Sequence, residues 1–269
     1  MLKTTLTAIV LLLLFPVSTS AESGSKTSTT SAADPNAKAI KSTQPLCLPF
    51  AGEKMTFAVN WEFINGGTAI METSAREKGY RIHTFAFTNK FMDVFHKVRD
   101  TMIADGFCNK GKMQSEEFTL EQREPKYSAT KKTRFLWQQD KVEYTHNKKT
   151  EMFDVPAGYV DVLSSFYAVR TMKLEIGKKQ QVPVFDQRKN YEVEVITHRK
   201  ETMRAPWSSK PVEVLVIQPI LKTDGVFSSK GEMLIWITND ERHIPLKVSA
   251  KVRIGHVLCY LTDYRPPAK

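Results

Sequence analysis

Apolar and polar residues alternate along most of the chain beyond residue 50. From Lys54 to Phe63, the odd-numbered residues are Met, Phe, Val, Trp and Phe, and the residues between them are mostly polar. Successive side chains of a β-strand point to opposite faces, so this pattern predicts a strand with one buried face. Similar runs occur at 68–75, 80–89, 95–104, 112–121, 133–138, 141–146, 191–197, 212–219, 232–238, 246–254 and 257–263. Short strands joined by Gly, Asn and Asp turns predict an antiparallel all-β domain.

One segment, Asp161–Ile176, has a helical period instead. Val162, Phe166 and Val169 fall on one face of such a helix. Asp161 is a suitable N-cap, and Gly177 is a suitable residue to end the helix. The sequence therefore predicts a curved antiparallel sheet, a β-roll or half-barrel, with one helix at about 161–176 packed on or covering its concave face. A helix that fills the core and a helix that gates a ligand cavity have the same pattern, so both interpretations remain open.

The N-terminal segment is typical of a signal peptide. Lys3 precedes an apolar run from Leu6 to Phe15, and Thr19–Ala21 offers the small residues that a signal peptidase recognises. The run is shorter than the roughly 20 residues that cross a bilayer. We therefore expect cleavage after Ala21 and a periplasmic or secreted protein that is not transmembrane. No cysteine follows the run, so no lipoprotein processing is expected.

The next segment, 22–44, is rich in Ser, Thr, Ala and Lys and has few residues to bury. Such a segment cannot offset its ordering entropy, so we expect a disordered linker. Residues 45–266 are expected to form a single β-rich domain.

The composition is that of an ordinary globular protein, with 41% hydrophobic and 25% charged residues among 269. The formal net charge is +10, but basic residues alternate with acidic and apolar ones. This pattern favours solvated strand faces over a nucleic-acid site, and no nucleic-acid partner is expected. If a basic face exists, for example at Lys131, Lys132 and Arg134, an exported protein would present it to lipid headgroups or wall polymers.

Three cysteines, Cys47, Cys108 and Cys259, leave at least one thiol unpaired within the chain. A disulfide between Cys47 and Cys259 and one between Cys47 and Cys108 are both compatible with the sequence. For Cys259 the favoured interpretation is a buried structural thiol.

Catalytic and cofactor motifs are missing from the sequence. There is no GxSxG, HExxH, P-loop or dinucleotide fingerprint, and the 6 histidines are scattered. We therefore expect no enzyme, no cofactor and no metal site. The densest polar cluster contains Asp93, His96, Arg99 and Asp100. An acid–base centre of Asp93 and His96 is one interpretation, but a structural salt bridge from Arg99 to a carboxylate is favoured.

Several spaced motifs resemble one family of exported bacterial proteins, the domain of unknown function 3108 family. The matching residues are Gly52-Glu53, Trp61, Gly67-Thr68-Ala69, Phe91, Asp93, Phe95, Lys97-Val98-Arg99-Asp100, Val162-Leu163-Ser164-Ser165, Tyr167, Arg170, Ile235-Trp236-Ile237-Thr238-Asn239-Asp240, Ile244-Pro245 and Gly255. The chain departs from the family at Val162, where members often carry proline. The resemblance implies an exported β-rich roll or half-barrel without an established activity, and it supplies no catalytic residues.

Two functions remain as hypotheses. The favoured one is non-catalytic binding of an amphiphile, a lipid or acyl chain, in the apolar concave face. The candidate ligand-binding residues are Trp61, Phe91, Phe95, Leu163, Phe166, Tyr167 and Trp236. The alternative is a structural or assembly factor that docks onto envelope proteins or an anionic polymer. Phe91 and Phe95 belong to an apolar segment that marks a lipid or protein contact if it is exposed, although burial in the core is favoured for it.

Overall fold

The structure of the chain is a computed structural model that describes residues 48–223, 226–227, 233–252 and 255–267. The predicted signal peptide, 1–21, and the predicted linker, 22–44, lie outside the described residues. The helices are α2 (Lys90–Asp93) and α3 (Val162–Arg170). The strands are β1 (Lys54–Trp61), β2 (Ile64–Arg76), β3 (Gly79–Thr88), β4 (Arg99–Asn109), β5 (Lys112–Glu124), β6 (Tyr127–Leu136), β7 (Lys141–His146), β8 (Lys149–Asp154), β9 (Lys179–Asp186), β10 (Lys189–Met203), β11 (Val212–Thr223), β12 (Val226–Phe227), β13 (Met233–Thr238), β14 (Pro245–Lys251) and β15 (His256–Arg265).

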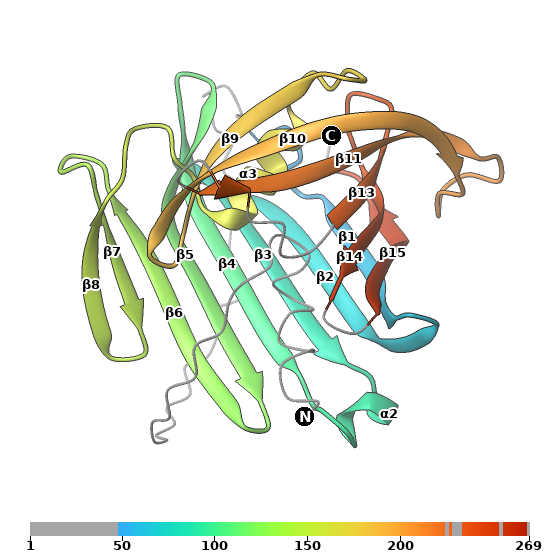
Figure 1. Ribbon diagram of the computed structural model, residues 1–269, viewed down its shortest axis with the longest axis horizontal. Coiled ribbons are helices and arrows are strands. Elements are labelled where there is room, and N and C mark those ends of the chain that lie inside the picture. The colour runs from blue at the N-terminus through green and yellow to red at the C-terminus, as the bar shows by residue number, and fades with distance from the viewer. Residues whose placement is uncertain (1–47, 224–225, 228–232, 253–254, 268–269) are drawn as a thin grey trace.

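All strands belong to one curved sheet. Their order is β8-β7-β6-β5-β4-β3-β2-β1-β15-β14-β13-β11-β10-β9, and β12 pairs with β11. The pairs are antiparallel, including that of β1 with β15, which joins the two ends of the domain. In Figure 1, β3–β6 form one wall, and β10 and β11 cross the opposite side. The prediction of an all-β fold with an antiparallel curved sheet is confirmed.

Side chains, rather than a strand ladder, bring the two edges of the sheet together. The ring of Phe185 in β9 lies 6.3 Å from that of Phe135 in β6 and 6.0 Å from that of Phe153 in β8. The side-chain amide of Asn190 also donates to the backbone carbonyl of Asp154 at 3.0 Å. Among the described residues, β8 and β9 share no backbone pairing. The sheet is therefore barrel-like but unclosed.

Helix α3 lies inside the curve of the sheet, between its two walls (Figure 1). Its buried residues are Val162, Leu163, Ser164, Ser165, Tyr167 and Arg170. The inward-facing side chains of the strands pack around it in one hydrophobic core. This arrangement confirms that the predicted helix packs on the concave face.

The predicted end of the helix, Ile176, is wrong, because α3 ends at Arg170. The hydroxyl and the N–H of Thr171 both donate to the carbonyl of Ala168, which caps the last turn. Gly177 does not end the helix. It has a φ of +78° and lies in the turn before β9, where its N–H donates to the carbonyl of Thr197.

Three strands, β8, β9 and the two-residue β12, and one helix, α2, were not predicted. Strand β8 has no buried position and β9 begins with polar residues, because both are edge strands with weak alternation. The strand predicted at 95–104 begins at Arg99. The residues before it form α2, where the side chain of Asn89 accepts the Met92 N–H at 2.9 Å.

The cysteines divide into one bonded and one free residue among those described. Cys108 is disulfide-bonded, and Cys47 lies outside the described residues. Cys259 is free and 2% exposed, and burial raises the pKa of its thiol to about 12. The prediction that Cys259 is a buried structural thiol is confirmed, and a Cys47–Cys259 bridge is excluded.

A buried ion pair attaches the end of α3 to the start of the sheet. The two guanidinium nitrogens of Arg170 lie 2.6 and 2.8 Å from the carboxylate oxygens of Glu53. The guanidinium also lies 4.0 Å from the ring centre of Phe50, and Tyr264 donates to Glu53 at 3.0 Å. Burial opposes the charged form of Arg170, but the hydrogen bonds to Glu53 outweigh it and raise the pKa of the guanidinium.

Removing the negative charge of this pair should destabilise the fold strongly. Glu53→Gln keeps the shape of the side chain but leaves the Arg170 charge buried and uncompensated, so we expect a loss of about 3–5 kcal/mol in the free energy of unfolding. Urea denaturation followed by circular dichroism measures this loss. The control is Lys54→Ala, which removes an exposed ion pair with Glu72 and should cost less than about 1 kcal/mol. Equal losses in the two variants would contradict this role for the pair.

Candidate functional site

A buried hydrogen-bond network fixes the N-terminus of α3. Asp161 caps the helix by accepting the Ser164 N–H at 2.9 Å. The hydroxyls of Ser164 and Ser115 also donate to its carboxylate, and the Ser164 hydroxyl lies 2.9 Å from that of Tyr80. Burial raises the pKa of Asp161, and the bonds from Ser115 and Ser164 oppose that shift. The network holds α3 against β3 and β5.

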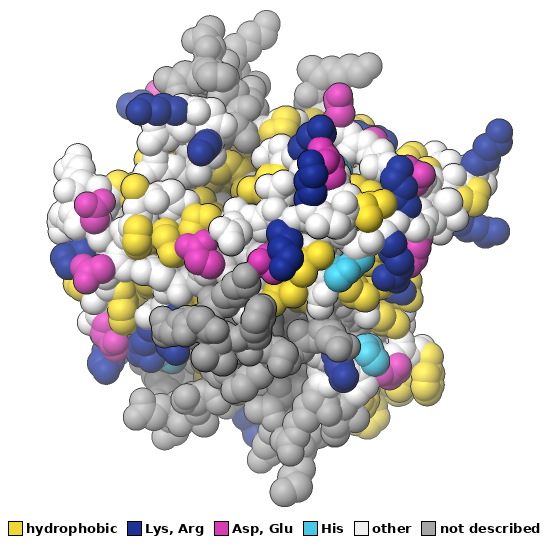
Figure 2. All heavy atoms as spheres, turned by 45° about the horizontal axis from the view of Figure 1, so that its top comes forward, with side chains coloured by type: hydrophobic (Ala, Val, Ile, Leu, Met, Phe, Trp, Pro, Cys, Tyr) yellow, Lys and Arg dark blue, Asp and Glu magenta, His cyan; other side chains and the backbone are white. Residues whose placement is uncertain are grey.

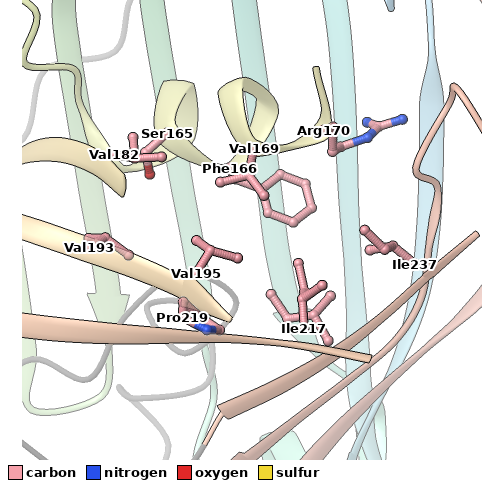
Figure 3. A pocket seen from close by; sticks show the side chains of 11 residues that line it. Ser165, Phe166, Val169, Arg170, Val182, Val193, Val195, Ile217, Pro219 and Ile237 are labelled. Carbon is pink, nitrogen blue, oxygen red and sulfur yellow. The ribbon is translucent and has the colours of Figure 1, made fainter. Parts of the chain in front are cut away.

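An apolar cleft lies between α3 and the opposite wall of the sheet (Figure 3). Its lining consists of Ser165, Phe166, Val169, Arg170, Val182, Val193, Val195, Ile217, Pro219, Ile235 and Ile237. The atom-free space is about 500 Å³ when the part open to solvent is included, and about 30 Å³ of it is available to the centre of a water molecule. The cleft is therefore narrow as it stands, with room for only about two waters.

The polar groups that border the cleft are already engaged elsewhere. The Ser165 hydroxyl donates to the carbonyl of Val162 at 2.7 Å. The guanidinium of Arg170 points away from the cleft in Figure 3, toward its partner Glu53. The cleft therefore presents hydrocarbon and offers no free charge for chemistry.

The predicted ligand-binding residues of α3 divide between cleft and core. The ring of Phe166 points into the cleft and is partly exposed. Leu163 and Tyr167 are 0% exposed and fill the core beside it. Trp236 lies between the cleft-lining Ile235 and Ile237 on β13, so its side chain is on the other face. There its indole N–H donates to Glu201 at 2.7 Å.

The other predicted ligand-binding residues lie at a different place, near α2. Trp61 lines a second apolar pocket together with Met92, Thr88 and Val98, and the atom-free space there is about 390 Å³ when the part open to solvent is included. Phe91 and Phe95 are 61% and 66% exposed, which contradicts the favoured interpretation that this segment is core. The structure therefore does not join the seven predicted residues into one site.

The predicted polar cluster separates into three different environments. Arg99 and Asp93 form two hydrogen bonds, at 2.7 and 3.0 Å, as expected for a structural salt bridge. These bonds, with one from Thr88, lower the pKa of Asp93. The His96 ring lies 3.1 Å from Glu124. Asp93 and His96 therefore have different partners, and the structure supports no acid–base centre made from them.

Asp100 lies on the inner face of the sheet with other polar residues that sequence reasoning missed. Gln122 and Lys131 are 2% and 8% exposed. The Oδ1 atom of Asp100 accepts the Arg123 N–H at 2.8 Å. The Oδ2 atom of Asp100 and the side-chain carbonyl oxygen of Gln122 are buried and have no hydrogen-bond partner. Burial raises the pKa of Asp100 to about 6 and that of Asp186 to about 6. The sequence does contain a signal for these buried polar residues, because each occupies a position at which the alternation of its strand calls for an apolar side chain.

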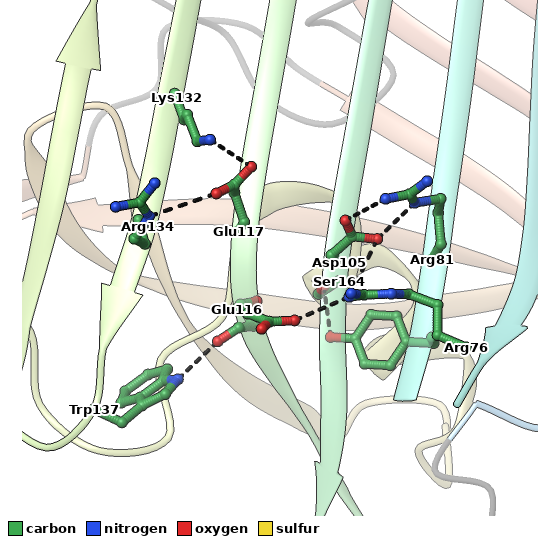
Figure 4. Close-up of polar contacts among 11 residues, drawn as sticks. Arg76, Arg81, Asp105, Glu116, Glu117, Lys132, Arg134, Trp137 and Ser164 are labelled. Atoms are coloured by element: carbon green, nitrogen blue, oxygen red, sulfur yellow. Dashed lines mark hydrogen bonds and ion pairs between the residues drawn. The ribbon is translucent and has the colours of Figure 1, made fainter. Parts of the chain in front are cut away.

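The basic outer face suggested by Lys131, Lys132 and Arg134 is not a free surface. Lys131 faces inward, and burial lowers the pKa of its ammonium group. Lys132 pairs with Glu117 at 2.8 Å, and Arg134 lies 3.6 Å from the same carboxylate. Figure 4 shows further pairs on neighbouring strands, Arg81 with Asp105 and Arg76 with Glu116. The face shown in Figure 2 also has acidic and basic groups intermixed.

The described residues contain neither a candidate metal site nor a helix that could span a membrane. That part of the chain has no group of three or more His, Cys, Asp or Glu residues that could hold a metal ion. None of its helices has the length and hydrophobicity needed to span a bilayer.

The fold and the cleft define a class of barrel-like β-proteins whose single sheet wraps around an internal helix. The chain belongs to the family described as protein of unknown function (DUF3108), whose model matches residues 56–262. Among solved structures, a β-barrel-like protein of domain of unknown function DUF1849 from Brucella abortus is 10% identical and has a TM-score of 0.53, covering 82% of this chain and 100% of that chain. At that identity the similarity shows the fold alone. No curated protein matches the chain significantly.

Asp100 should make stability depend on pH. Its pKa of about 6 exceeds the ordinary aspartate value of 3.8, so the native state binds more protons than the unfolded chain between these values. The stability contributed by Asp100 therefore falls as pH rises from 4 to 6. Asp100→Asn lacks this titration, so its stability relative to the wild type should rise by roughly 2 kcal/mol from pH 4 to 7.

Urea denaturation at several pH values measures this difference. Asp263→Asn alters an exposed carboxylate and serves as the control. A stability difference for Asp100→Asn that is the same at pH 4 and pH 7 would contradict the raised pKa.

Proposed function

We propose that this protein is an exported, non-catalytic carrier that binds the hydrocarbon chain of an amphiphile in the cleft beside α3. The observation that carries the proposal is the chemistry of the cleft. Its lining is aliphatic apart from the Phe166 ring, and its two polar residues are bonded to other groups. An apolar cavity holds water poorly, and filling it with hydrocarbon gains about 25 cal/mol for each Å² removed from water.

Binding requires the cleft to widen. The cleft is narrow as it stands, with room for only about two waters, so an acyl chain enters only if a lining side chain moves. Phe166 is the side chain suited to that movement, since it is partly exposed and projects into the cleft from α3. The helix itself is held at one end by Asp161 and at the other by Arg170. In this mechanism the side chain gates the cleft and the helix stays in place.

Export to the periplasm or outside the cell is part of the proposal. It rests on Lys3, the apolar run Leu6–Phe15 and the small residues Thr19–Ala21. The cysteine chemistry agrees, because Cys108 is disulfide-bonded and structural disulfides persist in oxidising compartments. The alternative of docking through a basic face is less favoured, because Lys132 and Arg134 are paired with carboxylates.

A dansyl-labelled fatty acid tests the cleft directly. The purified protein should raise the fluorescence of the probe in a saturable titration. Phe166→Asp places a charge in the apolar cleft, so the probe should bind about tenfold more weakly or worse. Circular dichroism and urea denaturation establish that the variant remains folded.

Two control variants locate the binding. Trp207→Asp alters an exposed aromatic side chain outside the cleft and should leave binding unchanged. Trp61→Asp alters the second pocket and should also leave it unchanged. Retained binding by folded Phe166→Asp, or loss only in Trp61→Asp, would refute the assignment to the α3 cleft.

A further inference from the structure

Large apolar side chains are exposed together at one end of the sheet. We define the apolar tip as Phe63, Phe91, Val94 and Phe95, whose exposed fractions are 92%, 61%, 81% and 66%. The other exposed large hydrophobic residues of the described chain, Met152, Ile176 and Trp207, have lower exposed fractions of 47%, 52% and 38%, and each comes from a different segment. Hydrophobic side chains protrude at the lower right of Figure 2, the end at which Figure 1 places α2. Isolated exposed residues are ordinary, but a group of this kind marks an interaction site.

The apolar tip is built from two segments that hydrogen bonds hold together. Phe63 lies in the turn between β1 and β2, and the other three residues lie in or just after α2. The side-chain amide of Asn89 donates to the backbone carbonyl of Asn65 at 2.7 Å, and its backbone N–H donates to the carbonyl of Gly66 at 3.0 Å. The turn and the helix are therefore fixed to one another.

The same segment is anchored to the protein on its inner side. Met92 is 8% exposed and lines the second apolar pocket. Asp93, the residue after Met92, accepts two hydrogen bonds from the Arg99 guanidinium, and these bonds fix its position. The rings of Phe91 and Phe95 contact each other edge to face, with centres 5.4 Å apart. Because Met92 is anchored inward, the phenyl groups stay on the outside in contact with water.

The charges beside the apolar tip favour an anionic partner. Lys90 and Lys97 are exposed, and neither forms an ion pair with a described residue. The two acidic residues of these segments are engaged within the protein. Asp93 binds Arg99, and Glu62 accepts the His256 N–H at 2.6 Å. Around Phe91 and Phe95 the charges without an ion-pair partner are therefore those of the two lysines, whereas the exposed Glu62 carboxylate lies beside Phe63 with the N–H and ring of His256 as its partners.

We propose that the apolar tip inserts into the surface of a phospholipid bilayer that contains anionic lipids. The phenyl groups would enter the boundary between headgroups and acyl chains, and Lys90 and Lys97 would meet the lipid phosphates. Apolar side chains next to unpaired lysines are the composition of segments that bind at this boundary. The inference does not depend on the α3 cleft.

Sedimentation with lipid vesicles tests this inference. The purified protein is mixed with vesicles of phosphatidylethanolamine containing about 30% phosphatidylglycerol, and separately with phosphatidylcholine vesicles. We expect binding to the anionic vesicles that weakens as salt is raised, because the lysine contribution is screened. Phe91→Ser/Phe95→Ser should reduce the partition coefficient by about tenfold or more. Lys90→Gln/Lys97→Gln should reduce it on anionic vesicles only.

Matched controls separate this result from other causes. Ile176→Ser removes an apolar side chain that is 52% exposed elsewhere on the protein, and this variant should bind as the wild type does. Phe166→Asp should also bind vesicles normally, so a failure of the carrier function and a failure of this inference can be told apart. The inference is overturned if the wild type does not bind anionic vesicles or if Phe91→Ser/Phe95→Ser binds them equally. Crosslinking of the tip to a protein without any vesicle binding would likewise overturn it.

Discussion

Arg170 and Glu53 form a buried ion pair on which the arrangement of the whole interior depends. The sheet is curved and unclosed, so its concave face would be open to water without α3. The helix has only nine residues, and an isolated helix of that length is not stable in water. Its position is therefore set by the contacts at its two ends, Asp161 at the start and Arg170 at the finish. The ion pair at the C-terminal end of α3 fixes how far the helix extends into the sheet, because any shift of the helix would separate the two buried charges.

That constraint also determines what the cleft can do. Leu163 and Tyr167 on one side of α3 fill the core completely, whereas Phe166 and Val169 face the opposite wall across the cleft. Because the polar groups of Ser165 and Arg170, which border the cleft, are bonded elsewhere, the cleft surface is left with hydrocarbon. The helix therefore packs into the core on one side, and its other side, with Phe166, lines the cleft to which the proposed function assigns the ligand. The apolar tip lies apart from it, on the β1–β2 turn and α2.

The sequence predicted the parts of the fold that depend on local pattern. Strict alternation identified most central strands, and the Asp161 cap with its apolar stripe identified the helix. The edge strands β8 and β9 were missed because edges are solvated on more sides and alternate weakly. The candidate site was predicted only in part. Phe166 was correctly placed toward the concave face, but the pairing of Arg170 with Glu53 joins residues 117 positions apart and has no local signal. The assignment of Trp236 to the ligand site was wrong for a different reason. Strand β13 is apolar on both faces, so its sequence does not show which face lines the cleft.

Native mass spectrometry tests the central claim, that the cleft carries an amphiphile, most directly. The protein would be purified from the soluble envelope fraction of its own cells without detergent, and its intact mass measured before and after extraction with organic solvent. The account predicts a stoichiometric excess mass that extraction removes, with a recovered molecule that contains a hydrocarbon chain. A mass equal to that of the polypeptide alone, together with a failure of added fatty acid to bind, would contradict it.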